Sequence, residues 1–220
     1  MNAYRELKQA VIDACLTLQQ MGYIIGTYGN ASARVPEGLI VTPSRVDYAT
    51  ITPDDMMVVS LDGQVLDGHR IPSSETSVHR LIYNARPDVG AVLHTHSLYA
   101  SAVSCLHETI PVIVEEQSQV IGAQIACAEY VPAGQHLALG QVVAEALGDS
   151  NGVLLANHGS VACGRDVADA LFAAQVLERV AQMYLLTRAA GSPVPIPDEH
   201  VRSERDRWLY KYGTTADGTV

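Results

Sequence analysis

Two histidines, His94 and His96, follow the apolar run Val89–Leu93 in the pattern His-Thr-His. Alternate side chains of a β-strand share a face, so both imidazoles are expected on one side, with Cα atoms about 6–7 Å apart, close enough to bind one metal ion. His158 follows a second apolar run, residues 152–157, where another strand is expected to meet a turn. Three histidine ligands leave a coordination position open, as catalytic zinc sites do. The alternative, that these are ordinary polar residues at strand ends, is less favoured once the polar motifs below are included.

The periodicity along the chain alternates between helical and strand spacing and predicts an α/β fold. Apolar residues such as Leu7, Val11 and Leu18 recur at helical spacing before Gly22. Helices are expected at residues 3–21, 73–85, 97–106, 134–147, 166–190 and 198–210, and strands at 31–35, 39–42, 56–61, 64–66, 89–93 and 152–157. The proline-rich segment 193–197 is expected to separate a tail rather than a second domain.

Length and composition favour one well-buried domain. The chain has 220 residues, of which 48% are hydrophobic, and a mean hydropathy of +0.10. This is enough for one core, and the length does not demand two. No apolar run approaches the roughly 20 residues of a membrane span. The first residues lack the basic and apolar segments of a secretory signal.

The charge and the cysteines bear on partners and on location. With 14 basic and 24 acidic residues the net charge is −10, which disfavours nucleic acid and anionic membranes as partners. Any anionic ligand must therefore be held by a local site. Cys15, Cys105, Cys127 and Cys163 lie far apart in apolar or small-residue surroundings and form no Cys-x-x-Cys motif. Buried, reduced thiols in a cytoplasmic protein are the expectation.

Three short polar segments have the composition of an anion site. Gly26-Thr27-Tyr28-Gly29-Asn30 can aim backbone N–H groups and short donors at an anion, although such turns are common without one. Thr42-Pro43-Ser44 adds a hydroxyl at a strand end. Ser73-Ser74 is expected to begin a helix, where N–H groups favour a phosphate, with plain N-capping as the alternative. Glu75 follows directly and is either a metal-side carboxylate or an ordinary first-turn acid.

Taken in order, five elements resemble the class II aldolase family, which is typified by L-fuculose-1-phosphate aldolase and includes L-ribulose-5-phosphate 4-epimerase and the adducin head domain. The elements are Gly26-Thr27-Tyr28-Gly29-Asn30-Ala31-Ser32, Thr42-Pro43-Ser44, Pro72-Ser73-Ser74-Glu75, His94-Thr95-His96 and Asn157-His158-Gly159. The resemblance to this family covers residues from about 5 to 212.

The resemblance implies a single-domain, three-layer α/β/α fold with a mostly antiparallel central sheet, assembled as a homotetramer. Residues 1–197 would form the aldolase-like domain, and the helix and tail at 198–220 would complete a neighbouring subunit's site. It also implies Zn²⁺, with Mn²⁺ or Co²⁺ as alternatives, on His94, His96 and His158, with Glu75 as the fourth ligand when no substrate is bound. The residues expected at the substrate phosphate are Thr27, Gly29, Asn30, Ser44, Arg45, Ser73 and Ser74.

The activity that the resemblance implies is a zinc-dependent cleavage of a ketose or deoxyketose 1-phosphate to dihydroxyacetone phosphate and an aldehyde. Zinc acts as a Lewis acid in such chemistry. Glu75 is expected to be the general base toward dihydroxyacetone phosphate. Tyr212, in the tail segment Lys211-Tyr212-Gly213, is the expected proton donor to the aldehyde oxygen, and Tyr210 leaves the register of the tail open.

Two departures from the family pattern keep the reaction open. Arg45 stands where the family usually has glycine, and it either narrows the approach of the phosphate or adds a donor to it. Glu115 and Glu116 lie where fuculose-phosphate aldolases have a tyrosine, and an acid there is similar to the general base of related dehydratases. The alternatives are therefore a dehydratase, 4-epimerase or decarboxylase on the same scaffold. A non-catalytic, adducin-like module is disfavoured because all three histidines and Glu75 are retained.

Overall fold

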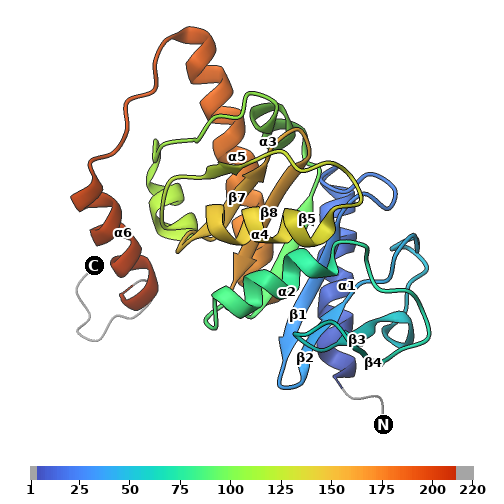
Figure 1. The fold of residues 1–220 in the computed structure, drawn as a ribbon. Helices are drawn as coiled ribbons and strands as arrows, with labels where there is room; N and C mark the ends of the chain where they lie inside the picture. The colour runs from blue at the N-terminus through green and yellow to red at the C-terminus, as the bar shows by residue number, and fades with distance from the viewer. Residues whose placement is uncertain (1–3, 212–220) are drawn as a thin grey trace.

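The computed structural model describes residues 4–211 and contains one eight-stranded sheet, drawn in Figure 1. The strand order is β4-β3-β2-β1-β5-β8-β7-β6, and every neighbouring pair is antiparallel except β6 and β7. The strands are β1 (Asn30–Val35), β2 (Gly38–Val41), β3 (Met57–Val59), β4 (Val65–Asp67), β5 (Ala91–Thr95), β6 (Ala126–Ala128), β7 (Gly152–Leu155) and β8 (Gly159–Gly164). The mostly antiparallel sheet is confirmed.

The predicted helices are present, with one informative difference at the start of the second. They are α1 (Arg5–Gln20), α2 (Thr76–Ala85), α3 (Leu98–Ser104), α4 (His136–Leu147), α5 (Val167–Ala190) and α6 (Asp198–Tyr210), with a 3-10 turn η1 (Pro53–Asp55) and a π-helix η2 (Gln117–Ile121). The expected helix start at Ser73 is wrong. Pro72 forms a β-bridge with Pro43, and the Ser73 amide donates to the Thr42 carbonyl, so this backbone is committed to the sheet and the helix begins at Thr76.

Helices cover both faces of the sheet and make the predicted three layers. In Figure 1, α2 and α4 lie in front of the strands, and α1 and α5 lie behind them. The alternation of strand side chains separates two cores: Ala91 and Leu93 pack into the one with α1, α3 and α5, whereas Val92 packs into the one with α2 and α4. The fold is a three-layer α/β/α domain.

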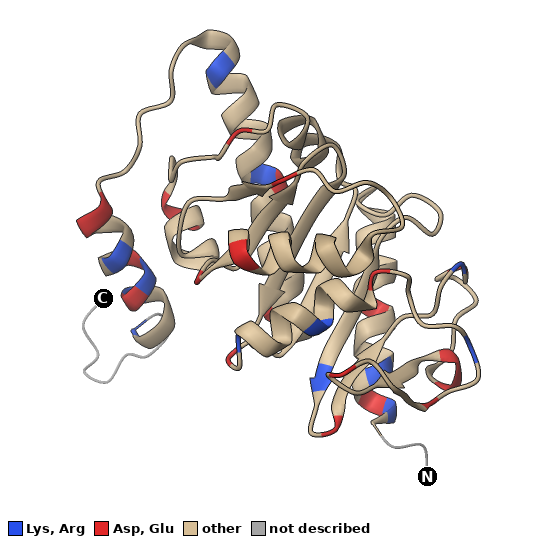
Figure 2. Ribbon diagram, viewed as in Figure 1, with Lys and Arg blue, Asp and Glu red and all other residues tan. Residues whose placement is uncertain are grey.

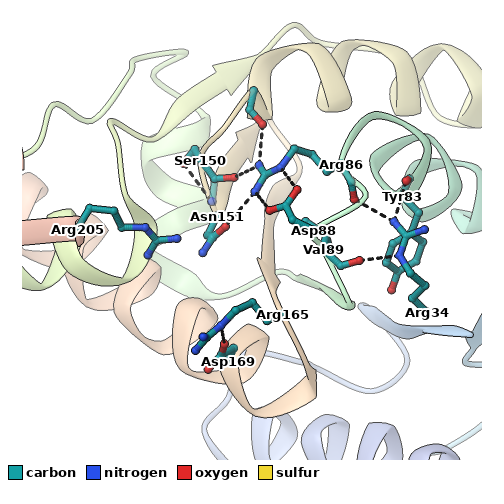
Figure 3. A network of polar contacts seen from close by, with 12 residues as sticks. Arg34, Tyr83, Arg86, Asp88, Val89, Ser150, Asn151, Arg165, Asp169 and Arg205 are labelled. Atoms are coloured by element: carbon teal, nitrogen blue, oxygen red, sulfur yellow. Dashed lines mark hydrogen bonds and ion pairs between the residues drawn. The ribbon is translucent and has the colours of Figure 1, made fainter. Parts of the chain in front are cut away.

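Two arginines fix the far end of α2 and thereby its position over β1 (Figure 3). Arg34, on β1, donates to the backbone carbonyl of Tyr83 at 2.7 Å. Arg86 follows α2 and donates to the Asp88 carboxylate at 2.7 Å and to the Ser150 carbonyl at 2.9 Å. Carbonyls at a helix C-terminus lack partners within the helix, and Arg34 satisfies one of them while it ties α2 to β1. Arg86 ties the end of α2 to the loop after α4.

The C-terminal helix α6 lies at one edge of the molecule, at the end of an extended connection from α5 (Figure 1). It packs on η2 of its own chain, where Arg205 donates to the Val120 carbonyl at 2.9 Å and Gln119 donates to Glu204 at 3.0 Å. Residues 212–220 lie outside the described part of the chain. The division into a domain at 1–197 and a tail at 198–220 that completes a neighbouring site stays a prediction.

The surface carries charges of both signs, and Figure 2 shows its lysines and arginines dispersed over separate elements. Within residues 4–211, no helix is long and apolar enough to cross a membrane. All four cysteines are unpaired, and Cys15 and Cys163 are buried as expected. The expectation is wrong for Cys105, which is exposed, and Cys127 is half-buried. Cys105 follows directly after the end of the short helix α3, where its apolar sequence neighbours do not cover it.

Candidate metal centre and anion site

His94 is held by the sheet with one ring nitrogen left for a ligand. It lies near the end of β5, pairs across the sheet with Asn30 on β1 and Val161 on β8, and is buried. Its Nδ1 lies 3.0 Å from the Ser160 carbonyl oxygen, which can only accept a hydrogen bond. The proton is therefore on Nδ1, and the Nε2 lone pair faces the other histidines, as in metal-binding histidines that donate their second N–H to a carbonyl.

His96 and His158 bring their rings to His94 from two different turns. His96 lies just beyond β5, where its amide donates to the Tyr23 carbonyl, and its Nε2 is 3.0 Å from that of His94. His158 lies in the turn between β7 and β8. Gly159 lets that turn approach β5, because a Cβ there would lie 2.3 Å from the Thr95 carbonyl oxygen. One ring nitrogen from each histidine lies within 4.8 Å of the others.

Glu75 completes the group from the N-terminus of α2. Its carboxylate oxygens lie 3.3 Å from Nε2 of His94 and 3.3 Å from Nε2 of His158, and it accepts from Asn30 Nδ2 at 2.7 Å. Burial acts to raise the pKa of Glu75, but its electrostatic interactions with His94 and His158, followed by the hydrogen bond from Asn30, outweigh burial and bring the pKa to about 2. The carboxylate is ionised at neutral pH and available as a ligand or base.

The imidazoles of His96 and His158 are kept neutral mainly by burial. Burial, and then repulsion from His94, lowers the pKa of His96 to about 3 and that of His158 to about 4. Neutral imidazoles and one carboxylate are the donor set of a catalytic zinc site. The three nitrogens and the carboxylate converge closely enough to share one ion, so these residues fit a divalent metal.

A cavity of about 320 Å³ adjoins this group, and all seven residues predicted at the phosphate line it. They are Thr27, Gly29, Asn30, Ser44, Arg45, Ser73 and Ser74. The β-bridge between Pro43 and Pro72 brings the two serine segments together. Glu75, His96 and His158 line the same cavity. Neutral donors and one arginine thus stand beside the metal-ligating group, although phosphate binding by these residues stays a prediction.

Backbone conformation explains the two unusual positions of this cavity. Gly29 has a φ of +124°, and a Cβ there would lie 2.9 Å from the His94 carbonyl oxygen, so glycine lets β1 lie against β5. Arg45 has a φ of +57°, in the left-handed region that favours glycine. Position 45 therefore has a backbone conformation that favours glycine, while this chain places an exposed arginine there.

A second cavity, of about 250 Å³, is also lined by Glu75 and His158. The loop before α4 lines it with Tyr130, Val131 and Pro132. The polar cavity and this more apolar cavity therefore meet at the metal-ligating group.

The catalytic roles predicted for Glu115 and Tyr212 stay predictions. Glu115 is exposed and lies outside the lining of both cavities, and its neighbour Glu116 faces Arg179 at 3.7 Å. Glu116 is the N-cap of the π-helix η2 (Gln117–Ile121), directly after Glu115, and the catalytic role of Glu115 stays a prediction. Tyr212 lies outside the described residues, and Tyr210 lines a separate cavity beside α6.

Sequence reasoning missed several residues that support the site. His79 and Tyr83 lie four and eight residues after Glu75, a spacing that places all three on one face of α2. Ser32 alternates with Asn30 on β1, so a polar stripe on the strand was also readable from the sequence. No comparable pattern indicated a role for Tyr28, whose ring lies 5.6 Å from that of His96.

The fold and the site together define a metal-dependent enzyme built on a three-layer α/β/α domain, with a polar cavity beside the metal-ligating residues. Residues 9–185 match the model of the class II aldolase and adducin N-terminal domain family. The chain belongs to this family, and its class of chemistry is that of a metal-dependent lyase.

Its relatives include enzymes with different reactions. The chain is 36% identical over 197 residues to the L-fuculose phosphate aldolase of Escherichia coli K12, covering 89% of this chain and 91% of that protein. It is 34% identical over 224 residues to the L-ribulose-5-phosphate 4-epimerase UlaF of Salmonella paratyphi B, covering 96% and 97%. A solved structure of an L-fuculose 1-phosphate aldolase superposes with a TM-score of 0.88 at 32% identity, over 93% of this chain and 97% of that one.

Proposed function

We propose that this protein is a zinc-dependent aldolase that reversibly cleaves a ketose or deoxyketose 1-phosphate to dihydroxyacetone phosphate and an aldehyde. One observation carries the proposal: the polar cavity and the metal-ligating group share Glu75, His96 and His158. A phosphate held in the polar cavity would place the adjacent carbonyl carbon at these residues. The aldehyde end of the substrate would extend into the cavity beside Tyr130. The similarity to L-fuculose phosphate aldolase supports the same reaction.

The phosphate would be held mainly by hydrogen bonds. Thr27, Ser44, Ser73 and Ser74 offer hydroxyls, Asn30 offers an amide, and the backbone at Gly29 presents no side chain to obstruct the anion. We assign Arg45 to the phosphate as a further, charged donor at the rim of the cavity. The left-handed backbone of Arg45 supports this assignment, because strained backbone conformations cluster at ligand sites, where the surrounding structure enforces them.

His94, His96, His158 and Glu75 would hold Zn²⁺, with Mn²⁺ or Co²⁺ as alternatives. The bound ion supplies Lewis-acid stabilisation of the negative charge that develops on the substrate oxygens. In the cleavage direction, a proton leaves the C4 hydroxyl, the C3–C4 bond breaks to release the aldehyde, and a proton is added at C3 to give dihydroxyacetone phosphate. Glu75, ionised and next to the cavity, is the group that exchanges the C3 proton.

We assign the proton at the aldehyde oxygen to Tyr212 of a neighbouring subunit in a homotetramer. This assignment follows the family resemblance of the tail and is compatible with the absence of Glu115 from the site of its own chain. A cytoplasmic location suits four unpaired thiols. The second candidate function is a 4-epimerase of a sugar phosphate, favoured by the 34% identity to UlaF over nearly the whole chain. A dehydratase would need Glu115 to reach a neighbouring site.

The decisive test is proton exchange. The zinc-loaded protein is incubated in D₂O with dihydroxyacetone phosphate alone, and loss of the exchangeable C3 proton is followed by NMR. Exchange is expected in the wild type and in Glu115→Gln. In Glu75→Gln the exchange rate is expected to fall by a factor of about 10²–10⁴. The zinc content of each variant is measured alongside. A panel of aldehydes then identifies the condensation product.

The outcomes separate the candidates. If the wild type shows no exchange and interconverts L-ribulose 5-phosphate with its 4-epimer, the protein is an epimerase and the aldolase proposal is wrong. If exchange is absent and Glu115→Gln abolishes turnover of a 1-phosphoketose, the dehydratase is the correct reaction. Light scattering of the purified protein tests the tetramer, and a monomer with full activity would remove the role given to Tyr212.

A further inference from the structure

A buried row of polar side chains runs from the interior to the Glu75 carboxylate. It begins at Tyr83, whose hydroxyl lies 2.8 Å from Ser32 Oγ, and continues from Ser32 Oγ to His79 Nδ1 at 2.6 Å. His79 Nε2 lies 2.5 Å from Asn30 Oδ1, and Asn30 Nδ2 donates to Glu75 Oε2 at 2.7 Å. Five side chains from one strand and one helix thus form four successive hydrogen bonds.

The row has one consistent direction. The ionised Glu75 can only accept, so Asn30 turns its Nδ2 toward it and its Oδ1 toward His79. His79 Nε2 must then carry the ring proton, because a carbonyl oxygen only accepts. A neutral His79 therefore accepts at Nδ1 from the Ser32 hydroxyl, and Ser32 accepts in turn from Tyr83. Hydrogen bonds aligned in this way polarise one another.

The surroundings of His79 keep it neutral and fixed. His79 and Ser32 are fully buried, and Tyr83 is 1% exposed. Burial, followed by repulsion from His94, lowers the pKa of His79 to about 3. The far end of the row is clamped by Arg34, whose guanidinium lies 4.6 Å from the Tyr83 ring centre and donates to its backbone carbonyl, as Figure 3 shows.

We propose that His79 is a positioning residue that sets the orientation of the Asn30 amide through its Nε2–H tautomer. In that orientation one Nδ2 hydrogen points to Glu75, and the other is left for an anion in the polar cavity that Asn30 lines. A rotated amide would set Oδ1 against the Glu75 carboxylate and leave no amide donor for the anion. His79 lines neither cavity itself and acts through Asn30. The anion part of this inference rests on the proposed function, whereas the tautomer does not.

The tautomer is tested directly on the full-length protein without substrate. Two-bond ¹H–¹⁵N correlation spectra distinguish a protonated from an unprotonated ring nitrogen, and His79→Gln identifies the signals. The expected pattern is a protonated Nε2 and an unprotonated Nδ1 for His79, unchanged from pH 8 to pH 6. A protonated Nδ1, or a doubly protonated ring in this range, would overturn the inference whatever the enzyme's activity.

The positioning role is tested with three variants and inorganic phosphate as the probe. Phosphate affinity of the zinc-loaded protein is measured by calorimetry, together with KM and kcat for a 1-phosphoketose that the wild type turns over. His79→Leu removes the donor to Asn30 and is expected to weaken phosphate binding and raise KM by about tenfold, at the lower end of the loss on removing supporting shells around metal sites. His79→Gln can still donate to Asn30 Oδ1 and is expected to recover most of this loss.

Ser77→Ala is the matched control, because it removes one hydrogen bond of α2, to the His136 carbonyl, that lies outside the row. It is expected to change phosphate affinity less than twofold. Equal phosphate affinity in His79→Leu and wild type would contradict the inference, and so would a His79→Gln variant that binds phosphate as weakly as His79→Leu. If His79→Leu does not fold, the tautomer and His79→Gln still decide. A wild type without activity on any 1-phosphoketose would remove the proposed function but leave the tautomer result standing.

Discussion

Glu178, on α5, anchors the segment that follows His96, and its replacement by glutamine gives a quantitative test of how the metal ligands are supported. Its carboxylate is buried and accepts from Ser97 Oγ at 2.6 Å, from the Tyr99 amide at 2.8 Å and from the Ala100 amide at 2.8 Å. The two amides belong to the first turn of α3, which has no other partner for them within the helix. The backbone just after His96 is therefore fixed by one carboxylate.

The cost of Glu178→Gln follows from the donors left over. Ser97 and Ala100 share Oε2, and Tyr99 uses Oε1, whereas glutamine offers a single acceptor oxygen. In either orientation its NH₂ group faces a buried N–H donor. One buried donor without a partner costs about 1–3 kcal/mol, and the bonds that remain lose their charge. We expect a loss of about 2 kcal/mol in the free energy of unfolding, or about 4–8 °C in Tm for a chain of this length.

The assay is chemical unfolding of the metal-free protein, followed by zinc affinity from chelator competition. Because the segment after His96 loosens, zinc affinity is expected to fall by about tenfold. Glu116→Gln is the control: its partner Arg179 lies 3.7 Å away, both side chains are solvent-exposed, and such pairs contribute at most about 1 kcal/mol. Equal stability of Glu178→Gln and Glu116→Gln would refute the reasoning, and a destabilised Glu178→Gln with unchanged zinc affinity would refute the link to His96.

Three further predictions follow from the site. His158→Ala removes one of three nitrogen ligands, so it should lose stoichiometric zinc on dialysis, measured by mass spectrometry, with an unchanged circular dichroism spectrum; full zinc retention would contradict the site. Gly29→Ala should lower the free energy of unfolding in urea by about 1–3 kcal/mol, because Gly29 has a φ of +124° and a Cβ there would meet the His94 carbonyl oxygen. Gly26→Ala should lower it less, because a Cβ at Gly26 would have no atom within 4 Å, and the reverse order would contradict this reasoning. The lowered pKa values of His96 and His158, about 3 and about 4, mean that the unfolded chain binds these protons first as the pH falls. Stability of the metal-free protein should be complete above pH about 6.5 and decline from there toward pH 4 by about 1.4 kcal/mol per pH unit for each histidine, measured by unfolding at several pH values; no decline would be inconsistent with neutral, buried rings.

Much of this protein could be predicted because the informative patterns are local. The apolar run before His94-Thr95-His96 predicts a strand with both rings on one side; in the structure His96 lies just beyond β5, and its Nε2 is 3.0 Å from that of His94. Glycines and hydroxyls in three short turns indicated an anion site, and the structure brings those turns to one cavity. The alternation of helical and strand spacing, together with the family resemblance, was sufficient for the three-layer fold.

Contacts between distant segments were decided only by the tertiary structure. The sheet register places Asn30 opposite His94, and the bridge between Pro43 and Pro72 delays the start of α2. Neither feature follows from local periodicity, because pairing partners lie tens of residues apart. The absence of Glu115 from the lining of both cavities is likewise a property of the tertiary structure.

The residues of the site, too, were determined partly by the sequence and partly by the tertiary structure. The sequence by itself determined which side chains could bind a metal and an anion, since that depends on residue type and on spacing along one strand or helix. Only the packing of α2 over β1 decided that His79 meets Asn30, because a buried polar group needs a partner and finds it on whichever element lies against it. The orientation of the Asn30 amide beside Glu75 is thus a property of the fold, because it depends on contact between Asn30 and His79, which lie 49 positions apart in the sequence.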